Sequence, residues 1–159
     1  MNNESRMDVA FAELYDVIAE KISSGDSIVF TANGTSMLPL IRGGVDRVTL
    51  SPLPDRIRKN DIVFYRRRNG VFVLHRVVRV SRDGSFVFCG DHQFALEKGI
   101  QPDQLLAILT ALEHDGSDFS FTTFSYRAYC FFLPLRRTVL RTRNFLYRKL
   151  RYLKSVLLH

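Results

Sequence analysis

Residues 62–89 read IVFYRRRNGVFVLHRVVRVSRDGSFVFC, and this stretch carries the clearest fold signal in the chain. Asn69-Gly70 separates two runs rich in Val, Phe and Tyr, and an Asn-Gly pair in that setting favours a tight β-hairpin turn. Asp83-Gly84 is a second turn of the same kind. We therefore predict three consecutive antiparallel strands over residues 62–67, 71–82 and 86–89.

The residues on either side of this hairpin extend the pattern. Turn residues separate further predicted strands at residues 27–31, 47–50, 105–112 and 118–124. Residues 6–24 have apolar positions near helical spacing, and Ser24-Gly25 ends that segment. The expected fold is mainly β and antiparallel, behind one N-terminal helix.

The end of the chain is basic and amphipathic. Residues 119–159 carry nine Lys or Arg and no acid, whereas residues 1–118 carry 14 basic and 16 acidic residues. From about Pro134 onward one helical stripe is apolar: Leu135, Val139, Leu146, Leu150, Leu153 and Leu157. The chain thus divides into an N-terminal helix at 1–25, a β domain at 26–126 and a basic amphipathic helical tail at 127–159.

A leucine stripe flanked by cations has three interpretations. The helix packs on its own domain, binds a partner, or lies on an anionic membrane surface. The membrane interpretation assigns eight basic side chains to the lipid surface: Arg136, Arg137, Arg141, Arg143, Arg148, Lys149, Arg151 and Lys154.

The sequence disfavours several classes of protein. Its longest apolar run, residues 129–135, is far shorter than the roughly 20 residues of a spanning helix, and no secretory signal is visible. Two cysteines are too few for a disulfide framework. Only one clear helix precedes the strands, too little for a helix-turn-helix, so no nucleic-acid partner is expected. We expect a cytoplasmic protein, soluble or peripheral on the inner face of the membrane.

Ser36 lies in GTSMLP, a loop at residues 34–39 that follows a predicted strand. Such a loop can present the Ser36 hydroxyl together with backbone N–H groups of Ser36 and Met37, and acyl transfer needs both an attacking oxygen and oxyanion donors. The alternative is a plain turn, because Ser and Pro are ordinary loop residues.

His75 is the only group in its apolar strand that titrates near neutral pH. It is either a general base or an ordinary core histidine, and strand alternation places Arg76 on the opposite face. Asp91 follows a strand and Gly90, where it either orients an imidazole or caps a turn. Cys89 and His92 resemble a metal-binding pair, but no second pair has ligand spacing, so no metal is expected.

Taken in order, these stretches resemble the motifs of type I signal peptidases, within the signal-peptidase/LexA-like superfamily of serine peptidases. GTSMLP at 34–39 resembles their nucleophile box, and NDIV at 60–63 resembles their Gly-Asp-Ile-Val strand. LHRV at 74–77 resembles their base box, and Gly90-Asp91 resembles their acid box. The likeness covers about residues 28–110 and is strongest to the endoplasmic-reticulum-like subset, which uses His where bacterial enzymes use Lys.

Three positions depart from the family pattern. Asn60 stands where the family has Gly, Gly34 stands where many members carry a hydroxyl residue, and Glu97 stands where the second acid is an Asp. We also expect the chain to lack the membrane anchor of signal peptidases.

The resemblance implies a signal-peptidase-like β core and hydrolysis of a leader or signal-type peptide, or of a protein substrate, through an acyl-enzyme. It implies Ser36 as nucleophile, His75 as general base, and Asp91 as the residue that holds the imidazole, with Glu97 assisting. No cofactor is required. The alternative function is an inactive module of the same fold, tethered to a membrane or an acidic partner by its basic tail.

Overall fold

The computed structural model describes residues 17–157. Residues 17–23 are helical, and the rest of the helix predicted at 6–24 lies outside the described residues. Ile18 and Ile22, one helical turn apart, are both buried. They attach this helix to the sheet, because side chains four residues apart share one helical face.

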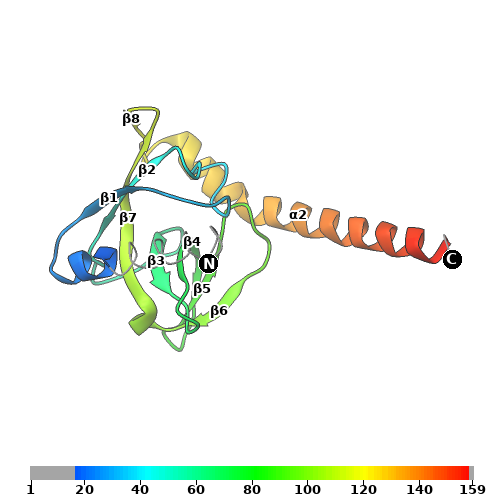
Figure 1. Cartoon of the computed structure of the whole chain (residues 1–159), viewed down its shortest axis with the longest axis horizontal. Helices are drawn as coiled ribbons and strands as arrows, with labels where there is room; N and C mark the ends of the chain where they lie inside the picture. The colour runs from blue at the N-terminus through cyan, green and yellow to red at the C-terminus, as the bar shows by residue number, and fades with distance from the viewer. Residues whose placement is uncertain (1–16, 158–159) are drawn as a thin grey trace, which may run out of the picture.

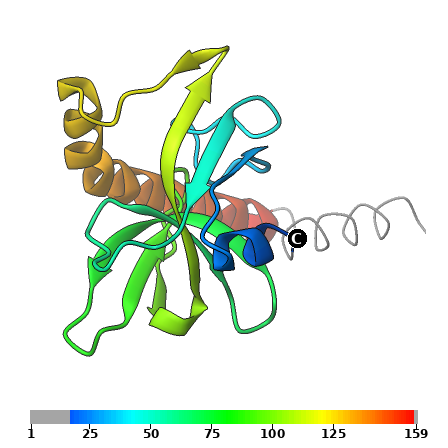
Figure 2. The ribbon, with the colours of Figure 1, turned by 90° about the vertical axis from the view of Figure 1, so that its left-hand side faces the viewer.

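Eight strands form one antiparallel sheet, which makes the protein mainly β. In chain order they are β1 (Ile28–Thr31), β2 (Arg47–Ser51), β3 (Ile62–Arg66), β4 (Phe72–Val80), β5 (Phe86–Cys89), β6 (Glu97–Ile100), β7 (Leu105–His114) and β8 (Ser117–Asp118). The spatial order is β1-β2-β7-β3-β4-β5-β6, and β8 pairs with β7. Figures 1 and 2 show this sheet twisted into the body of the molecule.

The predicted hairpin is present, with Arg66 opposite Phe72 across the turn. Gly70 has a φ of 86°, a left-handed conformation that glycine adopts without steric cost. β4 pairs with β5 only from Arg76 onward, and within the described residues β1 pairs with β2 alone. The first half of β4 and one side of β1 therefore keep unpaired backbone edges.

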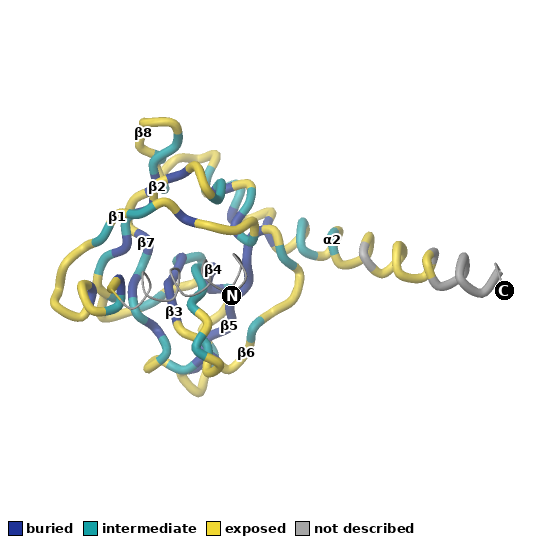
Figure 3. The backbone as a smooth tube through the Cα atoms, in the orientation of Figure 1, coloured by how far each residue is buried: buried dark blue, intermediate teal, exposed yellow. Residues whose placement is uncertain are grey.

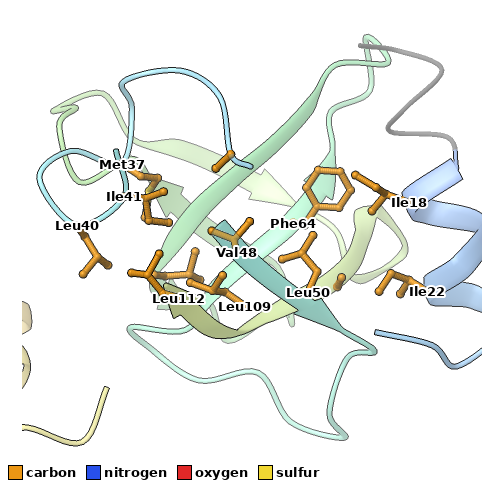
Figure 4. Close-up of a cluster of buried hydrophobic side chains, with 13 residues drawn as sticks. Ile18, Ile22, Met37, Leu40, Ile41, Val48, Leu50, Phe64, Leu109 and Leu112 are labelled. Atoms are coloured by element: carbon orange, nitrogen blue, oxygen red, sulfur yellow. The ribbon is translucent and has the colours of Figure 1, made fainter. Parts of the chain in front are cut away.

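Two groups of buried side chains pack on the sheet. One group joins the N-terminal helix, β2, β3 and β7 to the loop after β1, and its labelled members in Figure 4 include Met37, Leu40 and Ile41 of that loop. The second group includes Val63, Tyr65, Val77 and Phe88. Residues on either side of Ser36 are thus fixed by burial of apolar surface.

The structure differs from the predicted elements at one strand and at two boundaries. β6 has no counterpart in the sequence prediction, and the strand predicted at 118–124 is wrong beyond Asp118, where β8 ends. The helix α2 (Phe124–Leu157) begins about ten residues earlier than the stripe from Pro134 suggests. Its start is set by Thr123, whose hydroxyl accepts a hydrogen bond from the N–H of Tyr126 at 3.3 Å, as an N-cap does.

α2 packs on the domain only through its first turns. Cys130 and Leu133 are buried, whereas Leu135, Val139 and Leu146 keep more than half of their surface exposed. Figures 1 and 3 show the helix leaving the body of the molecule, with its outer part mostly exposed. Within residues 17–157, no helix has the combination of length and apolar character that crossing a membrane requires.

Candidate active site

The loop that carries Ser36 is folded tightly on itself. Met37 is 5% exposed and Ile41 is 2% exposed, so the loop is anchored on both sides of its turn. A Cβ atom at Gly43 would lie 2.1 Å from the carbonyl oxygen of Gly34, so only glycine allows this approach. Ser36 itself is half-buried.

A charged cluster closes the far end of the same loop. Asp46 is fully buried and accepts hydrogen bonds from the backbone N–H of Arg42 at 2.6 Å and from its guanidinium at 2.6 and 2.9 Å. Burial alone would raise the pKa of Asp46, but these hydrogen bonds, together with His114, lower it to about 2. The loop is therefore braced by an ionised carboxylate at neutral pH.

The backbone of Ser36 lies directly against the turn that follows β5. The N–H of His92 donates to the carbonyl oxygen of Ser36 at 2.8 Å. A Cβ atom at Gly90 would lie 2.5 Å from that oxygen, so a side chain cannot replace the glycine without moving one of the two loops. The nucleophile motif and the acid motif, more than 50 residues apart in sequence, are thus in direct contact.

His75 lies in β4 opposite Val63 and is 2% exposed. Its Nδ1 atom is 3.1 Å from Oε1 of Glu97 and 3.4 Å from the hydroxyl of Tyr65. Arg67 also donates to Glu97, with its Nε atom 2.7 Å from Oε2. Glu97 is therefore the carboxylate that contacts the histidine ring.

The environment of this pair decides which groups are charged. Burial lowers the pKa of His75 below its usual 6.5, and the negative charge of Glu97 offsets only part of that effect. Burial alone would raise the pKa of Glu97, but the neighbouring Arg67 and Tyr65 outweigh it and leave that pKa below its usual 4.5. At neutral pH the arrangement is a neutral imidazole against an ionised carboxylate, which is the state of a general base.

Asp91 does not contact His75, and its expected role as the residue that holds the imidazole is not what the geometry supports. Both of its oxygens are bound by Arg76, at 2.8 and 2.7 Å, and Oδ2 also accepts a hydrogen bond from Tyr129 at 2.9 Å. Asp91 and Arg76 are almost completely buried. As predicted, Arg76 and His75 point to opposite faces of β4. Asp91 binds Arg76 and acts on the imidazole only through a small electrostatic effect that raises the pKa of His75.

Two of the eight tail cations turn toward the domain instead of toward solvent. Arg136 donates to the carbonyl oxygens of Leu38 at 3.2 Å and Asp91 at 2.7 Å, and to Nδ1 of His92 at 3.1 Å. Arg137 has an 11% exposed side chain, next to Asp91. Arg136 therefore joins α2 to both loops of the site, and its assignment to a lipid surface is wrong.

A cavity of about 120 Å³ opens beside Ser36. Apart from Ser36 its lining is mostly apolar, and it includes Phe30, Ala32, Val73 and Leu74. The cavity thus lies between the unpaired edges of β1 and β4, and Leu74 directly precedes His75. Among the described residues the Ser36 hydroxyl makes no hydrogen bond, and the backbone N–H groups of Ser36 and Met37 have no acceptor.

Several of these features escaped sequence reasoning. Tyr65 and Arg67 contribute to the histidine pair only because β3 and β4 form a hairpin, and no local motif marks them. Asn60 has a φ of 78°, which explains why Asn can stand where the resembling family has Gly, since both accept this conformation. Among the described residues no group of three or more His, Cys, Asp or Glu could hold a metal ion.

Comparison of the chain with models of known protein families and with curated proteins finds no match. The geometry of the site is therefore the main support for a function.

Proposed function

We propose that the protein is a serine endopeptidase that acts through an acyl-enzyme on Ser36, with His75 as general base. The observation that carries the proposal is that the Ser36 loop contacts the turn after β5, while β5 pairs with β4 from Arg76, the neighbour of His75. The backbone of Ser36 is bonded to the Gly90–His92 turn, while the neighbouring strand presents a buried, neutral His75 against Glu97.

The chemistry follows from these positions. Glu97 accepts a hydrogen bond from the Nδ1–H group of His75 and holds the tautomer in which Nε2 is the basic nitrogen. Nε2 removes the proton of the Ser36 hydroxyl as its oxygen attacks the carbonyl carbon of the substrate, and then gives that proton to the leaving amine. Water, activated by the same nitrogen, hydrolyses the ester and restores Ser36. The unbonded N–H groups of Ser36 and Met37 supply the oxyanion donors.

The substrate we propose is an extended peptide. Unpaired edges of β1 and of the first half of β4 flank the cavity at Ser36, and an exposed edge can pair with an added strand. The apolar lining and the volume of about 120 Å³ favour a small apolar side chain next to the cleaved bond. A leader or signal-type peptide, or a processed protein segment, has this chemistry.

An active-site-directed fluorophosphonate probe tests the proposal. The wild type should be labelled at Ser36 and should cleave a peptide library at small apolar residues, whereas Ser36→Ala should do neither and should melt within about 2 °C of the wild type, because the loss of one half-buried hydroxyl removes little packing. Thr35→Ala, an exposed neighbour in the same loop, is the matched control and should keep activity.

An inactive binding module of the same fold is the alternative function. Among the described residues no hydrogen bond joins Ser36 to His75, and this observation favours it, although catalytic hydrogen bonds in free enzymes often shorten only with substrate. Wild-type protein that is neither labelled by the probe nor active on any peptide, while it still binds peptides, would support the module and contradict the peptidase.

We also propose that α2 brings the protein to an anionic membrane surface. Beyond its docked turns the helix exposes large apolar side chains, including Val139, Phe145 and Leu146. The same part of the chain carries no acid and many Lys and Arg. An apolar face with surrounding cations is the arrangement that binds interfaces of anionic lipid.

A further inference from the structure

A groove of about 260 Å³ lies where α2 leaves the domain. Lys59, Arg137 and Arg141 line it, and no acidic residue does. A second, more open groove continues from it over β4 to β6 and shares Lys59, Val78 and Leu96 with it. That second groove adds four cations and again no acid: Arg56, Arg58, Arg79 and Lys98.

Among the described residues, the only groove cation with an ion pair is Arg137, whose Nη2 lies 3.9 Å from Oδ1 of Asp91. Within residues 17–157, Lys59 and Arg141 take part in no ion pair, and neither do the four cations of the second groove. Residues 26–126 are nearly balanced by sequence, with 12 basic and 11 acidic residues, so the concentration of cations on this surface arises from folding. It faces the same junction as the inner turns of α2.

Arg137 is the decisive residue. Its side chain is 11% exposed, and its Nε and Nη2 atoms are buried without a hydrogen-bond acceptor among the described residues. The nearest carboxylate oxygen, Oδ1 of Asp91, is 3.9 Å from Nη2 and already accepts from Arg76. A buried cation with unfilled donors is costly, and the thiol of Cys89 and the shared oxygen of Asp91 offset only part of that cost. Nη1 is not among the buried unfilled atoms, so it is the nitrogen through which an anion in the adjoining groove would balance the guanidinium charge.

Apart from its cations, Asn60 and Thr138, the lining of the groove is apolar. Its walls include Val78, Phe94, Leu96, Leu133 and Pro134. Phe94 and Leu96 are 40% and 44% exposed, on the rim rather than in the core. A free inorganic anion would leave this surface uncovered, whereas an amphiphile with a phosphate group and short apolar branches would fill both parts of the groove.

We propose that this groove binds the phosphate group of an anionic phospholipid, with Arg137 as the buried donor and Lys59 and Arg141 at the mouth. The proposal extends the membrane association proposed above, but a single lipid molecule in solution can test it separately. Guanidinium is suited to the role because its planar fork matches two phosphate oxygens.

The experiment is calorimetric titration of the full chain with dihexanoyl phosphatidic acid below its micelle concentration. Arg137→Gln should weaken binding about 10- to 100-fold, the range expected for hydrogen bonds to charged groups. Arg137→Lys should recover only part of the loss. Because Arg137→Gln could impair folding, Lys59→Gln/Arg141→Gln is a second variant at exposed positions, and it should weaken binding about tenfold. Arg143→Gln removes a charge from α2 outside the groove and should bind like the wild type.

Two results would overturn the inference. One is a loss of affinity in Arg143→Gln as large as that in the groove variants, since the net charge of the protein would then explain the binding. The other is equally tight binding of glycerol 3-phosphate or inorganic phosphate, since the apolar walls would then contribute nothing. Vesicle binding is scored separately: wild type that binds the soluble lipid but not phosphatidic-acid vesicles would contradict the membrane association and leave the groove supported.

Discussion

His75 combines burial with a single carboxylate contact, and the balance between the two sets its protonation. Burial is the larger effect, so the pKa of His75 lies below 6.5 and the ring is neutral at physiological pH. An unfolded chain would take up a proton near pH 6.5 that the folded chain does not. Acidification below pH 6.5 therefore lowers the folding stability. Further acidification through the pKa of the folded ring removes the catalytic base.

The peptidase proposal predicts a one-sided pH profile. Plotted against pH, kcat/KM should be level near neutrality and fall on acidification, with a midpoint below 6.5 that reports the free enzyme. A midpoint above 6.5 would contradict the burial of the base. Two variants should move the midpoint in opposite directions. Glu97→Gln removes a charge that raises the pKa of His75 and should lower the midpoint, whereas Arg67→Gln removes a charge that lowers this pKa and should raise it.

Asp91→Asn should act mainly on stability and should lower the midpoint of this profile less than Glu97→Gln does, because Asp91 is the smaller of the two charges that raise the pKa of His75. Asp91 is the partner of a guanidinium that is 1% exposed, and removing one member of a buried pair typically costs about 3–5 kcal/mol of unfolding free energy. Urea denaturation measures the loss. If Asp91→Asn kept its stability but shifted the acid limb of activity as far as Glu97→Gln does, Asp91 would be a main partner of His75 after all, as the motif alone suggests.

Much of the candidate site could be predicted from short motifs, but the division of labour between its acids could not. Ser36 and His75 were nominated from their local settings and from the resemblance to signal-peptidase motifs, and Glu97 from that resemblance alone. Asp91 was nominated on both grounds and received the wrong partner. Arg76 and His75 are adjacent in β4, and adjacent strand residues face opposite sides of the sheet. A sequence motif does not indicate which of these two side chains a given acid will contact.

At the scale of elements, the site depends on one close approach between two loops. Gly90 has an ordinary φ, so its role is the space that a missing side chain leaves next to the Ser36 carbonyl oxygen. Substitution by Ala introduces a carbon about 2.5 Å from that oxygen, and either loop must move to accommodate it.

Gly90→Ala should therefore lower kcat/KM at least about 10- to 100-fold, since a displacement near 1 Å at a reacting atom has effects of this size. Gly84→Ala is the control: it lies in the β4–β5 turn with a φ of 81°, so Ala is strained there and costs about 1 kcal/mol of stability, but this turn is at the other end of β5 from Gly90. Activity and thermal melts of both variants separate the two effects. Equal activity of Gly90→Ala and wild type would show that the approach of the loops is not needed.

The strands were predictable where the sequence alternates or turns on Asn-Gly and Asp-Gly, as in β3 to β5. β6 was missed because Glu97–Ile100 contains a glutamate, a lysine and a glycine, residues that do not favour a strand. The segment becomes a strand by pairing with β5. The start of α2 was missed because Pro134 suggested a helix beginning. Proline inside a helix costs about 3 kcal/mol, but here the burial of Cys130 and Leu133 and the Thr123 cap favour the longer helix.

At the scale of the whole molecule, the cations of α2 differ in their surroundings along the helix. The inner turns of α2 use Arg136 for the domain and Arg137 for the groove, and the outer turns keep their cations in solvent. Membrane association should therefore depend on the outer cations. Arg148→Gln/Lys149→Gln should weaken binding to anionic vesicles about 10- to 30-fold at low salt, at roughly 1 kcal/mol per charge.

Arg68→Gln/Arg82→Gln is the matched control, because both residues are exposed in turns of the β domain and the charge change is the same. It should bind vesicles within about threefold of the wild type. Sedimentation with anionic and neutral vesicles at two salt concentrations provides the measurement. If the two double variants lose affinity equally, net charge and not the position of α2 governs binding.

The hydrogen bond between His92 and the Ser36 carbonyl oxygen has a consequence for direction. The peptide unit that joins Ser36 to Met37 is trans and planar, so its C=O and N–H groups point opposite ways. Because the oxygen is held by the turn after β5, the Met37 N–H must point away from that turn. Arg136 holds the same turn from α2. The turn after β5 contributes no reacting atom, but it sets the direction of the Met37 N–H and therefore the side from which this group can donate to a negatively charged oxygen.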